Sequence, residues 1–282
     1  MFSDVLLTVD FDRTLTATDS TIPQRNLDAI RYFMENGGSF TVNTGRSIPM
    51  FLDKLHKVPT NAPLLLYNGS GDCAPGTTTL TRTALLDLDP AKVLPELQQR
   101  FPNLTVEVQG TRAHYTIQEN PAWVRYCEHN HCAWGYAPAD NLPDPFIKFA
   151  IYGQFRDETV ASLYDTTPEE EAETLEMIAY LQERYGDKVD IFRACARITD
   201  VHAKGVSKGN AARDLKKQLG KKILVCVGDA ENDLAMLQGA DYAFCPADGV
   251  VAHLFPNVCP CDEGAVADVI YKKIPEILGI CP

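Results

Sequence analysis

The hydrophobic pattern near the start of the chain alternates between two periods. Short continuous apolar runs, which indicate strands buried on both faces, occur at residues 3–10, 40–42 and 64–67. Between these runs, apolar residues spaced three and four apart indicate two helices, one opening at Pro23 and one spanning residues 48–56. Strand, helix, strand, helix, strand is the order of a doubly wound parallel sheet, which predicts an α/β fold.

The first of these helices carries its apolar side chains on one face. Leu27, Ile30 and Met34 recur at the helical spacing, so they are expected to pack against the sheet. Gly37 and Gly38 follow them and favour the end of the helix before the next strand.

After residue 69 the pattern changes to shorter elements. An extended arm is expected over residues 77–86, a hairpin from residues 104–108 and 113–118, and a further strand over residues 146–152. This mixture differs from the preceding alternation and indicates a separate α+β domain inserted into the first one.

A long helix from Pro168 belongs to the same insertion. Thr167 is its expected N-cap, Glu170 would complete a capping box, and Gly186 lies beyond its end. These end signals fix the helix more firmly than its apolar pattern does.

The parallel rhythm then returns until the end of the chain. Its expected elements are a helix, a strand, a helix, a strand and a closing helix, at residues 208–219, 223–227, 232–238, 242–244 and 265–278. We therefore expect a Rossmann-like core domain built from residues 1–84 and 195–282, with an inserted α+β cap domain over residues 85–194.

The charge balance excludes some partners. With 38 acidic and 26 basic side chains among 282 residues, the chain has a formal charge of -12, which argues against a nucleic-acid surface or an anionic membrane. An anionic substrate would therefore need a metal or a few placed cations. No apolar run approaches a membrane span, and nine widely spaced cysteines favour reduced thiols in the cytoplasm.

Two carboxylates follow the first expected strand. Asp10 and Asp12 stand where ligands gather in a parallel sheet, at the carboxyl end of a strand, with Thr14 completing the motif. If the chain turns there, one carboxylate can act as nucleophile and metal ligand while the other handles a proton. The alternative is that Asp12 and Thr14 only cap a turn.

Two further segments could bind phosphate. Thr44 and Gly45 follow the second strand just before a helix, where a hydroxyl and a main-chain N–H can hold an oxyanion, although Thr-Gly turns are common. Lys208 begins a helix, an unfavourable place for a cation unless it meets an anion. Lys204 is the competing lysine.

A polar cluster follows the strand at residues 223–227. Asp229 stands at the strand end after Gly228, which is expected to permit a sharp turn, and Asn232 and Asp233 would share a helical face with it. Such hard oxygen donors suit magnesium. Helix capping would explain one of these polar residues but not the whole group.

These four motifs, in this order, resemble the haloacid dehalogenase superfamily, and the insertion resembles the type II (C2B) cap of its Cof-like, sugar-phosphatase branch. The resemblance implies that Asp10 is a nucleophile that forms an aspartyl-phosphate and that Asp12 is the general acid and base. It also implies two sets of binding residues. The phosphoryl group would be held by the Phe11 main chain, Thr44, Gly45, Lys208 and Asn232. Magnesium would be held by Asp10, the Asp12 carbonyl and Asp229, with Asp233 supporting the metal or orienting Lys208.

The residue at position 12 also separates branches of the superfamily. True dehalogenases and ion-pumping ATPases lack this aspartate, whereas phosphatases and phosphomutases have it, so dehalogenation is disfavoured. Members commonly carry glycine where this chain has Arg13. The loop is therefore expected to be stiffer here, or Arg13 to face the cap.

The resemblance implies hydrolysis of a small phosphorylated metabolite, with a sugar phosphate as the leading substrate class. A phosphomutase similar to eukaryotic phosphomannomutases is the first alternative, and a non-catalytic metabolite sensor is the second. A sensor needs no nucleophile, so the intact set of Asp10, Asp12, Lys208 and Asp229 argues against it. The sequence does not specify an oligomeric state.

Two weaker signals lie in the expected cap. Residues 127–132 place two cysteines and two histidines close together, but one short segment rarely supplies a whole zinc site. The end of a cap helix is therefore the favoured interpretation of this segment, and metal binding the less favoured one. Arg112 and His114 are polar residues expected to be exposed on the cap, where they would affect substrate specificity.

Overall fold

The computed structural model describes residues 1–153 and 166–280. The chain forms two compact units. The first contains Met1–Gly45, Lys54–Thr81 and the chain from Ser207 onward, and the second contains Arg46–Asp53 and Arg82–Val206. Among the helices of the described residues, none is both long and apolar enough to cross a bilayer.

The first unit is organised around a parallel sheet of five strands in the order β14-β13-β12-β1-β2. Its central strands are almost wholly apolar and buried, as a sheet covered on both faces requires. The strands span Val5–Val9 (β1), Ser39–Val42 (β2), Ile223–Val227 (β12), Tyr242–Pro246 (β13) and Asn257–Val258 (β14). The expected parallel α/β core is thus confirmed.

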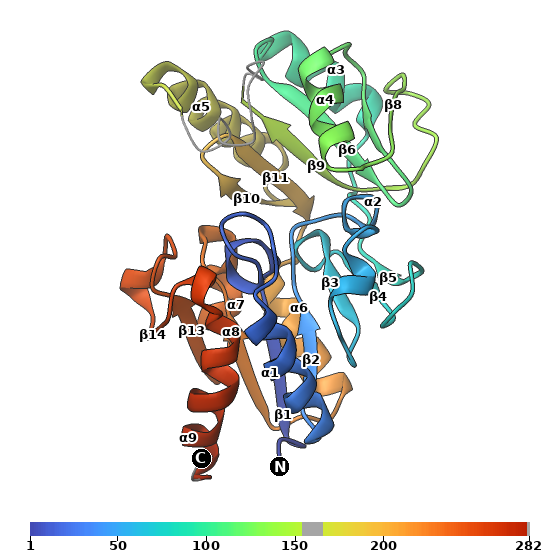
Figure 1. Cartoon of the computed structure of the whole chain (residues 1–282). Helices are drawn as coiled ribbons and strands as arrows, with labels where there is room; N and C mark the ends of the chain where they lie inside the picture. Colours follow the sequence, from blue (N-terminus) through green and yellow to red (C-terminus); the bar gives the residue numbers. More distant parts are fainter. Residues whose placement is uncertain (154–165, 281–282) are drawn as a thin grey trace. The chain divides into compact units, whose positions relative to one another are not determined.

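Helices cover both faces of this sheet (Figure 1). The pair α6 (Lys208–Gln218) and α7 (Leu234–Gln238) packs on Leu6, Leu224 and Cys226. The other face carries α1 (Gln24–Glu35) in contact with the C-terminal helical segment, α8 (Ala265–Asp268) and α9 (Ile274–Leu278), which a π-helical turn joins.

Helix α1 forms as expected but faces the sheet differently. Of its three predicted contacts only Ile30 is fully buried, whereas Leu27 and Met34 are half-buried. The helix instead buries Ala29 and Phe33. The Phe33 ring lies against the Cα of Gly38 and 5.1 Å from the Phe2 ring, so the largest apolar side chain sets the rotation of the helix.

The third expected strand forms, but with a different partner. Strand β3 (Leu64–Leu66) pairs antiparallel with β4 (Gly71–Cys73) in a small sheet completed by β5 (Leu80–Thr83). A single parallel bridge from Asn43 to Leu65 links β3 to the end of β2. The helix expected over residues 48–56 is only one α-turn long, α2 (Ile48–Phe51), followed by a short 3-10 turn.

The second unit contains a six-stranded sheet in the order β10-β11-β9-β6-β7-β8. Its strand pairs are antiparallel except β7 with β8. The strands span Thr105–Gly110 (β6), His114–Thr116 (β7), Trp134–Tyr136 (β8), Phe146–Tyr152 (β9), Val189–Cys195 (β10) and Ile198–Ala203 (β11). The predicted hairpin and the strand at 146–152 are therefore present.

The capping signals of the long helix are confirmed. In α5 (Pro168–Tyr185) the Thr167 hydroxyl accepts from the Glu170 N–H at 3.3 Å, and the Glu170 carboxylate accepts from the Thr167 N–H at 2.9 Å. A further helix, α3 (Pro90–Arg100), was not predicted, whereas α4 (Pro121–His129) is the cap helix expected to end within residues 127–132. Each begins with an Asp or Asn N-cap followed by proline, a start signal that the sequence did contain.

The predicted C-terminal end of the inserted segment is too early. Residue 194 lies inside β10, which pairs with β11, and the second unit continues to Val206. Cutting the chain at 194 would break this strand pair, because β11 is hydrogen-bonded on both sides within the same sheet.

Candidate active site

The candidate site lies in the first unit, at the carboxyl ends of β1 and β12. These neighbouring parallel strands are in register, with Val9 opposite Val227, and the Asp10 N–H donates to the Val227 carbonyl at 2.9 Å. The next residues of both strands therefore emerge side by side, which brings Asp10 and Asp229 together although 219 positions separate them in sequence.

A single turn reverses the chain after Asp10. The Leu15 N–H donates to the Asp10 carbonyl at 3.2 Å, and inside this turn Arg13 adopts φ 57°, a left-handed conformation. That conformation explains why glycine is common at this position in the family that the sequence resembles. Arg13 itself is exposed, and its N–H donates to the Thr16 hydroxyl at 3.1 Å.

The turn also places Thr14 against the second strand end. Thr14 is fully buried, and its hydroxyl donates to Asp229 Oδ1 at 2.9 Å. Thr14, from the motif after β1, therefore positions the Asp229 carboxylate, from the motif after β12. The sequence did not predict this role.

Lys208 is the cation of the site. Its Nζ donates to Asp10 Oδ1 at 2.5 Å and to Asp233 Oδ1 at 2.6 Å, and its side chain is wholly buried. The competing Lys204 lies in the second unit, where its Nζ pairs with Asp190 at 2.8 Å. Of the two lysines, only Lys208 contacts the carboxylates at the strand ends.

Asp233 is held rigidly beneath the site. Its Oδ2 accepts from the N–H groups of Asp229 at 3.0 Å and Ala230 at 3.1 Å, while Oδ1 accepts from Lys208. A Cβ on Gly228 would lie 2.7 Å from Asp233 Cγ. Glycine is therefore required for close approach of the Asp233 side chain, which corrects the expectation that it permits a sharp turn.

Three carboxylates converge here in the arrangement that a hard cation requires. Asp10, Asp229 and Asp233 each offer an oxygen, and these atoms lie within 4.8 Å of one another. Asp233 uses both of its oxygens in the contacts above, which makes Asp10 and Asp229 the candidate direct ligands and gives Asp233 a supporting place. Oxygen donors at this spacing fit magnesium.

The pKa values show an excess of negative charge. Burial raises the pKa of Asp10 well above its usual value, and Lys208 only partly offsets this effect. Burial and the neighbouring Asp233 raise the pKa of Asp229 to about 7. Carboxylates whose pKa values are raised by burial and by neighbouring carboxylates are typical of metal and phosphoryl sites.

The predicted phosphate-binding residues Thr44 and Gly45 follow the end of β2. Thr44 is buried, its N–H donates to the Leu65 carbonyl at 2.9 Å and its carbonyl accepts from the Asn68 N–H at 3.0 Å. A Cβ on Gly45 would lie 2.9 Å from Asn68 Oδ1, so glycine is needed where the main chain passes that side chain. Both residues stay predicted phosphate contacts.

Asn43 was missed by the sequence analysis. It is fully buried, and its Nδ2 donates to the Lys208 carbonyl at 2.9 Å, so the end of β2 is tied to the first turn of α6. An asparagine at a buried strand end next to Thr44 was the available signal.

The remaining predicted residues lie at the edge of this cluster. Asp12 and Asn232 are half-buried, and Phe11 is buried at the start of the turn. Among the described residues, the carboxylates that converge within 4.8 Å are those of Asp10, Asp229 and Asp233, and the Asp12 carboxylate does not belong to this group. This placement suits a proton-handling role for Asp12 better than direct ligation through its side chain.

The fold and the site together define a doubly wound α/β protein with a cluster of three carboxylates at the carboxyl edge of its sheet. The family model for haloacid dehalogenase-like hydrolases matches residues 7–252. The chain therefore belongs to this family, and the resemblance expected from its motifs is confirmed.

Known relatives agree with this assignment. A haloacid dehalogenase-like hydrolase from Bacteroides thetaiotaomicron is 18% identical, with a TM-score of 0.76 over 95% of this chain and 98% of that one. A solved structure described as a subclass IIB sugar phosphatase is 19% identical, with a TM-score of 0.74 over 98% and 99%. A Metamycoplasma hominis protein provisionally named a phosphatase is 24% identical over 255 residues, 86% of each chain.

Proposed function

We propose that this protein is a magnesium-dependent phosphatase that hydrolyses a small phosphomonoester through an aspartyl-phosphate on Asp10. The observation that carries the proposal is the pair of contacts from Lys208 to Asp10 and Asp233, beside a third carboxylate on Asp229. A buried nucleophile next to a fixed cation and a cation-binding oxygen cluster is what attack on an anionic phosphate ester requires.

In the first half-reaction, an Asp10 oxygen forms a bond to phosphorus while the bond from phosphorus to the ester oxygen breaks. Asp12, protonated, gives its proton to the departing oxygen, so the leaving group departs as an alcohol. Lys208 contacts the nucleophile already in the resting protein, and it offers positive charge to the phosphoryl oxygens as their charge develops.

In the second half-reaction, Asp12 acts in the reverse sense. Its carboxylate takes a proton from water, whose oxygen bonds to phosphorus while the bond from phosphorus to Asp10 breaks, releasing inorganic phosphate. Asp10 and Asp229, with the Asp12 carbonyl, would hold magnesium, which neutralises repulsion between the anionic nucleophile and the anionic substrate. Thr44, Gly45, Asn232 and the Phe11 main chain would position the phosphoryl oxygens.

A sugar phosphate is the proposed substrate class. Its support is the fold shared with a subclass IIB sugar phosphatase. The described cysteines are free thiols, which supports the cytoplasm as the proposed compartment.

Phosphate release across a panel of sugar phosphates, nucleotides and pyridoxal phosphate tests this function. We expect release that stops on exhaustive chelation and resumes with magnesium. Isomerised sugar phosphate without phosphate release would instead support the phosphomutase. A protein that binds panel members but transforms none would support the sensor.

A further inference from the structure

The two faces of the sheet in the second unit differ in chemistry. One face packs apolar side chains such as Val108, Phe149 and Ile151 against the helices. The opposite face carries the buried polar side chains Glu107 and Gln109 from β6, next to Lys148 on β9. Burial of so many polar groups is costly unless each one is satisfied, so their partners indicate what this face is built to hold.

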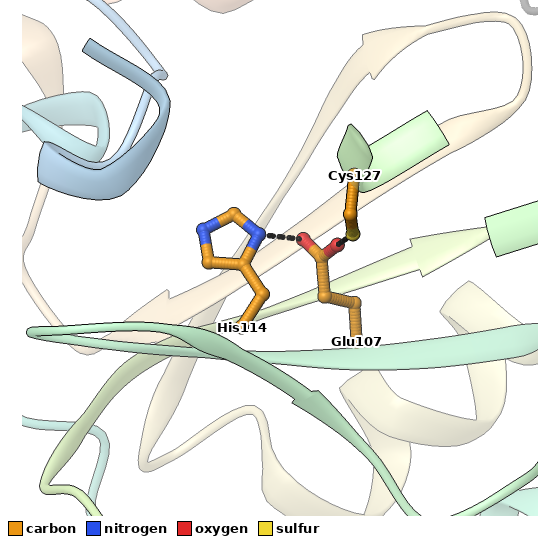
Figure 2. Close-up of side chains that lie close together, drawn as sticks. All are labelled: Glu107, His114 and Cys127. Carbon is orange, nitrogen blue, oxygen red and sulfur yellow. Dashed lines mark hydrogen bonds and ion pairs between the residues drawn. The ribbon is translucent and has the colours of Figure 1, made fainter. Parts of the chain in front are cut away.

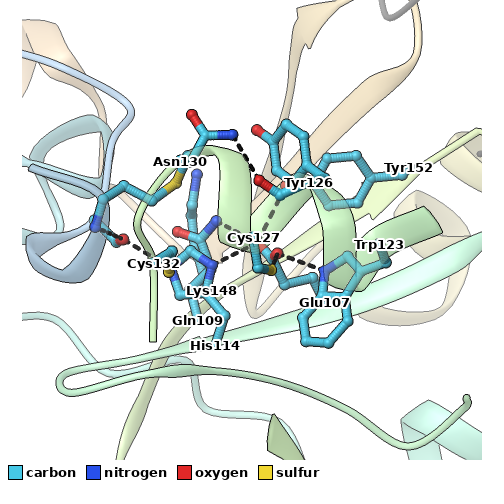
Figure 3. A network of polar contacts seen from close by, with 12 residues as sticks. Glu107, Gln109, His114, Trp123, Tyr126, Cys127, Asn130, Cys132, Lys148 and Tyr152 are labelled. Atoms are coloured by element: carbon cyan, nitrogen blue, oxygen red, sulfur yellow. Dashed lines mark hydrogen bonds and ion pairs between the residues drawn. The ribbon is translucent and has the colours of Figure 1, made fainter. Parts of the chain in front are cut away.

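Glu107 is the centre of this polar face (Figure 3). Its carboxylate is fully buried and accepts from Trp123 Nε1 at 2.7 Å, Gln109 Nε2 at 2.6 Å and the Tyr152 hydroxyl at 3.1 Å. Three donors from two strands and one helix fix the orientation of the carboxylate, as the surroundings of a metal-binding carboxylate do.

His114 lies beside Glu107 with its two ring nitrogens in different environments. Nε2 lies 2.7 Å from the Ser47 hydroxyl, which also accepts from the Met50 N–H. Nδ1 lies 3.2 Å from Glu107 Oε1, yet it has no partner in hydrogen-bond geometry, although the side chain is only 1% exposed. With the ring proton on Nε2 and donated to Ser47, Nδ1 keeps a lone pair for a metal, and in the other tautomer Nδ1 carries the proton toward Glu107.

Cys127 completes the cluster from the last turn of α4. Its buried Sγ lies 3.9 Å from Glu107 Oε2. One ligand atom each from Glu107, His114 and Cys127 lies within 4.8 Å of the others, and Figure 2 shows the three side chains directed toward one another. A carboxylate, an imidazole and a thiol converge there without exposure to solvent.

We propose that Glu107, His114 and Cys127 form a zinc site within the second unit, separate from the magnesium site. Sulfur and nitrogen donors select a borderline metal such as zinc over magnesium. The charges also balance, because one carboxylate and one thiolate neutralise a divalent cation. Gln109 Oε1, which is buried without a hydrogen-bond partner, would accept from a water in the fourth position.

Metal binding exchanges a proton for zinc. Burial and the neighbouring Glu107 raise the pKa of the Cys127 thiol far above its usual value, so the thiol is protonated in the metal-free protein. Binding forms a bond between sulfur and zinc, breaks the S–H bond and releases one proton to solvent. The site is enclosed, so the metal is expected to enter as the protein folds.

The site differs from the one considered for residues 127–132. His129 and His131 are exposed, so of that segment only Cys127 joins the cluster. The other two ligands come from β6 and β7, which the sequence placed in a hairpin without specifying the face of either side chain. His114 is buried, which corrects the expectation that it is exposed on the cap.

Cobalt substitution tests this proposal independently of catalysis. The full chain is expressed in minimal medium supplemented with cobalt, purified, and examined by absorption spectroscopy and metal analysis. We expect about one equivalent of cobalt held against mild chelation. A thiolate-to-cobalt charge-transfer band should accompany it, since an oxygen-only site cannot produce one. Expression with zinc should give a similar equivalent of zinc.

Variants assign the band to these residues. Cys127→Ser should abolish it, and His114→Gln and Glu107→Gln should each reduce cobalt content severalfold. Cys73→Ala removes a buried thiol of the other unit and should leave the band unchanged, as should Asp229→Asn at the magnesium site. Circular dichroism identifies any variant that fails to fold, in which case the remaining variants decide.

A folded wild-type protein without stoichiometric zinc or cobalt would overturn the proposal. So would a charge-transfer band that survives in folded Cys127→Ser. In either case the cluster would be only a hydrogen-bonded core from Ser47 to Glu107.

Discussion

Each unit of this protein buries a cluster of ionisable groups, and the two clusters differ in how their carboxylates are satisfied. In the second unit, burial opposes ionisation of Glu107, but His114 and the donors Gln109 and Trp123 lower its pKa overall. In the first unit, burial dominates and raises the pKa values of Asp10 and Asp229. Burial is similar in the two clusters, so the supply of donors determines the direction of each shift.

This difference separates two roles for a buried carboxylate. The fold supplies hydrogen-bond donors to Glu107, which orient its carboxylate beside His114 and Cys127, as a structural metal site requires. Asp10 accepts from Lys208 and Asp229 accepts from Thr14, and the two carboxylates lie close together. Carboxylates that the fold leaves short of positive charge attract a cation, which a phosphoryl-transfer site needs before an anionic substrate can approach.

The largest effect should follow Asp10→Asn. The amide cannot form the acyl phosphate, so turnover should fall by roughly 10⁴-fold or more, and no phosphoenzyme should form. Asp4→Asn is the matched control, because Asp4 forms only a surface ion pair with Lys222, and it should retain normal turnover. Mass spectrometry after an acid quench locates the phosphoryl group. Trapping on another residue, or normal turnover of Asp10→Asn, would refute the nucleophile assignment.

Asp12→Ala should separate the two half-reactions. A good leaving group such as nitrophenolate needs little acid help, so Asp10 should still be phosphorylated, whereas attack by water should slow. The variant should therefore accumulate phosphoenzyme relative to the wild-type protein. A variant that turns over at the normal rate without accumulation would remove Asp12 from the proton transfers.

Lys208→Ala should lower turnover by roughly a hundredfold or more, because it removes the cation next to the nucleophile. Lys204→Ala is the matched control in the other unit. Lys204 forms a partly exposed ion pair with Asp190, so its loss should leave kcat unchanged. Steady-state kinetics on both folded variants decides the matter. If Lys204→Ala is the impaired variant, the wrong lysine has been assigned.

Trp123→Phe tests how firmly Glu107 is held. The substitution keeps a six-membered ring but removes the pyrrole half of the indole, and with it the hydrogen bond to the buried carboxylate. The free energy of unfolding should fall by about 1.5–3 kcal/mol from the lost hydrogen bond, in addition to the packing that Trp134→Phe also loses. Trp134→Phe keeps the edge-to-face ring contact with Trp123 and should cost less. Denaturant unfolding measures both changes. Equal effects of the two substitutions would show that ring packing, not the hydrogen bond, stabilises this face.

The smallest effect concerns magnesium affinity and pH. Asp229, with its pKa raised to about 7, is largely protonated below that pH, and only the ionised carboxylate binds the cation. Affinity should therefore increase about tenfold between pH 6 and pH 8, as the proton leaves. Calorimetric titration measures the magnesium affinity at each pH. Asp229→Asn should weaken magnesium binding and flatten its dependence on pH. Affinity that decreases over this range would contradict the assignment of Asp229 as a ligand.

The local features of the chain could be predicted from its sequence. Apolar period and capping residues located most strands and helices, and the box of Thr167 and Glu170 forms as expected. The motif residues Asp10 and Asp229 could be placed together because parallel strands end at a common edge. Helix α3 was missed although an N-cap residue and a proline mark its start, so the sequence contained a signal that was not used.

Other features depended on the tertiary structure, because they arise from contacts between distant segments. Alternation along a strand gives two faces, but only the pairing of β6 with β9 and β7 shows that Glu107 and His114 lie together and meet Cys127 on α4. In the same way, the register of β1 with β12 brings Thr14 to Asp229. The sequence by itself determined which residues carry chemistry, and the packing of strand ends and faces determined which of them act together.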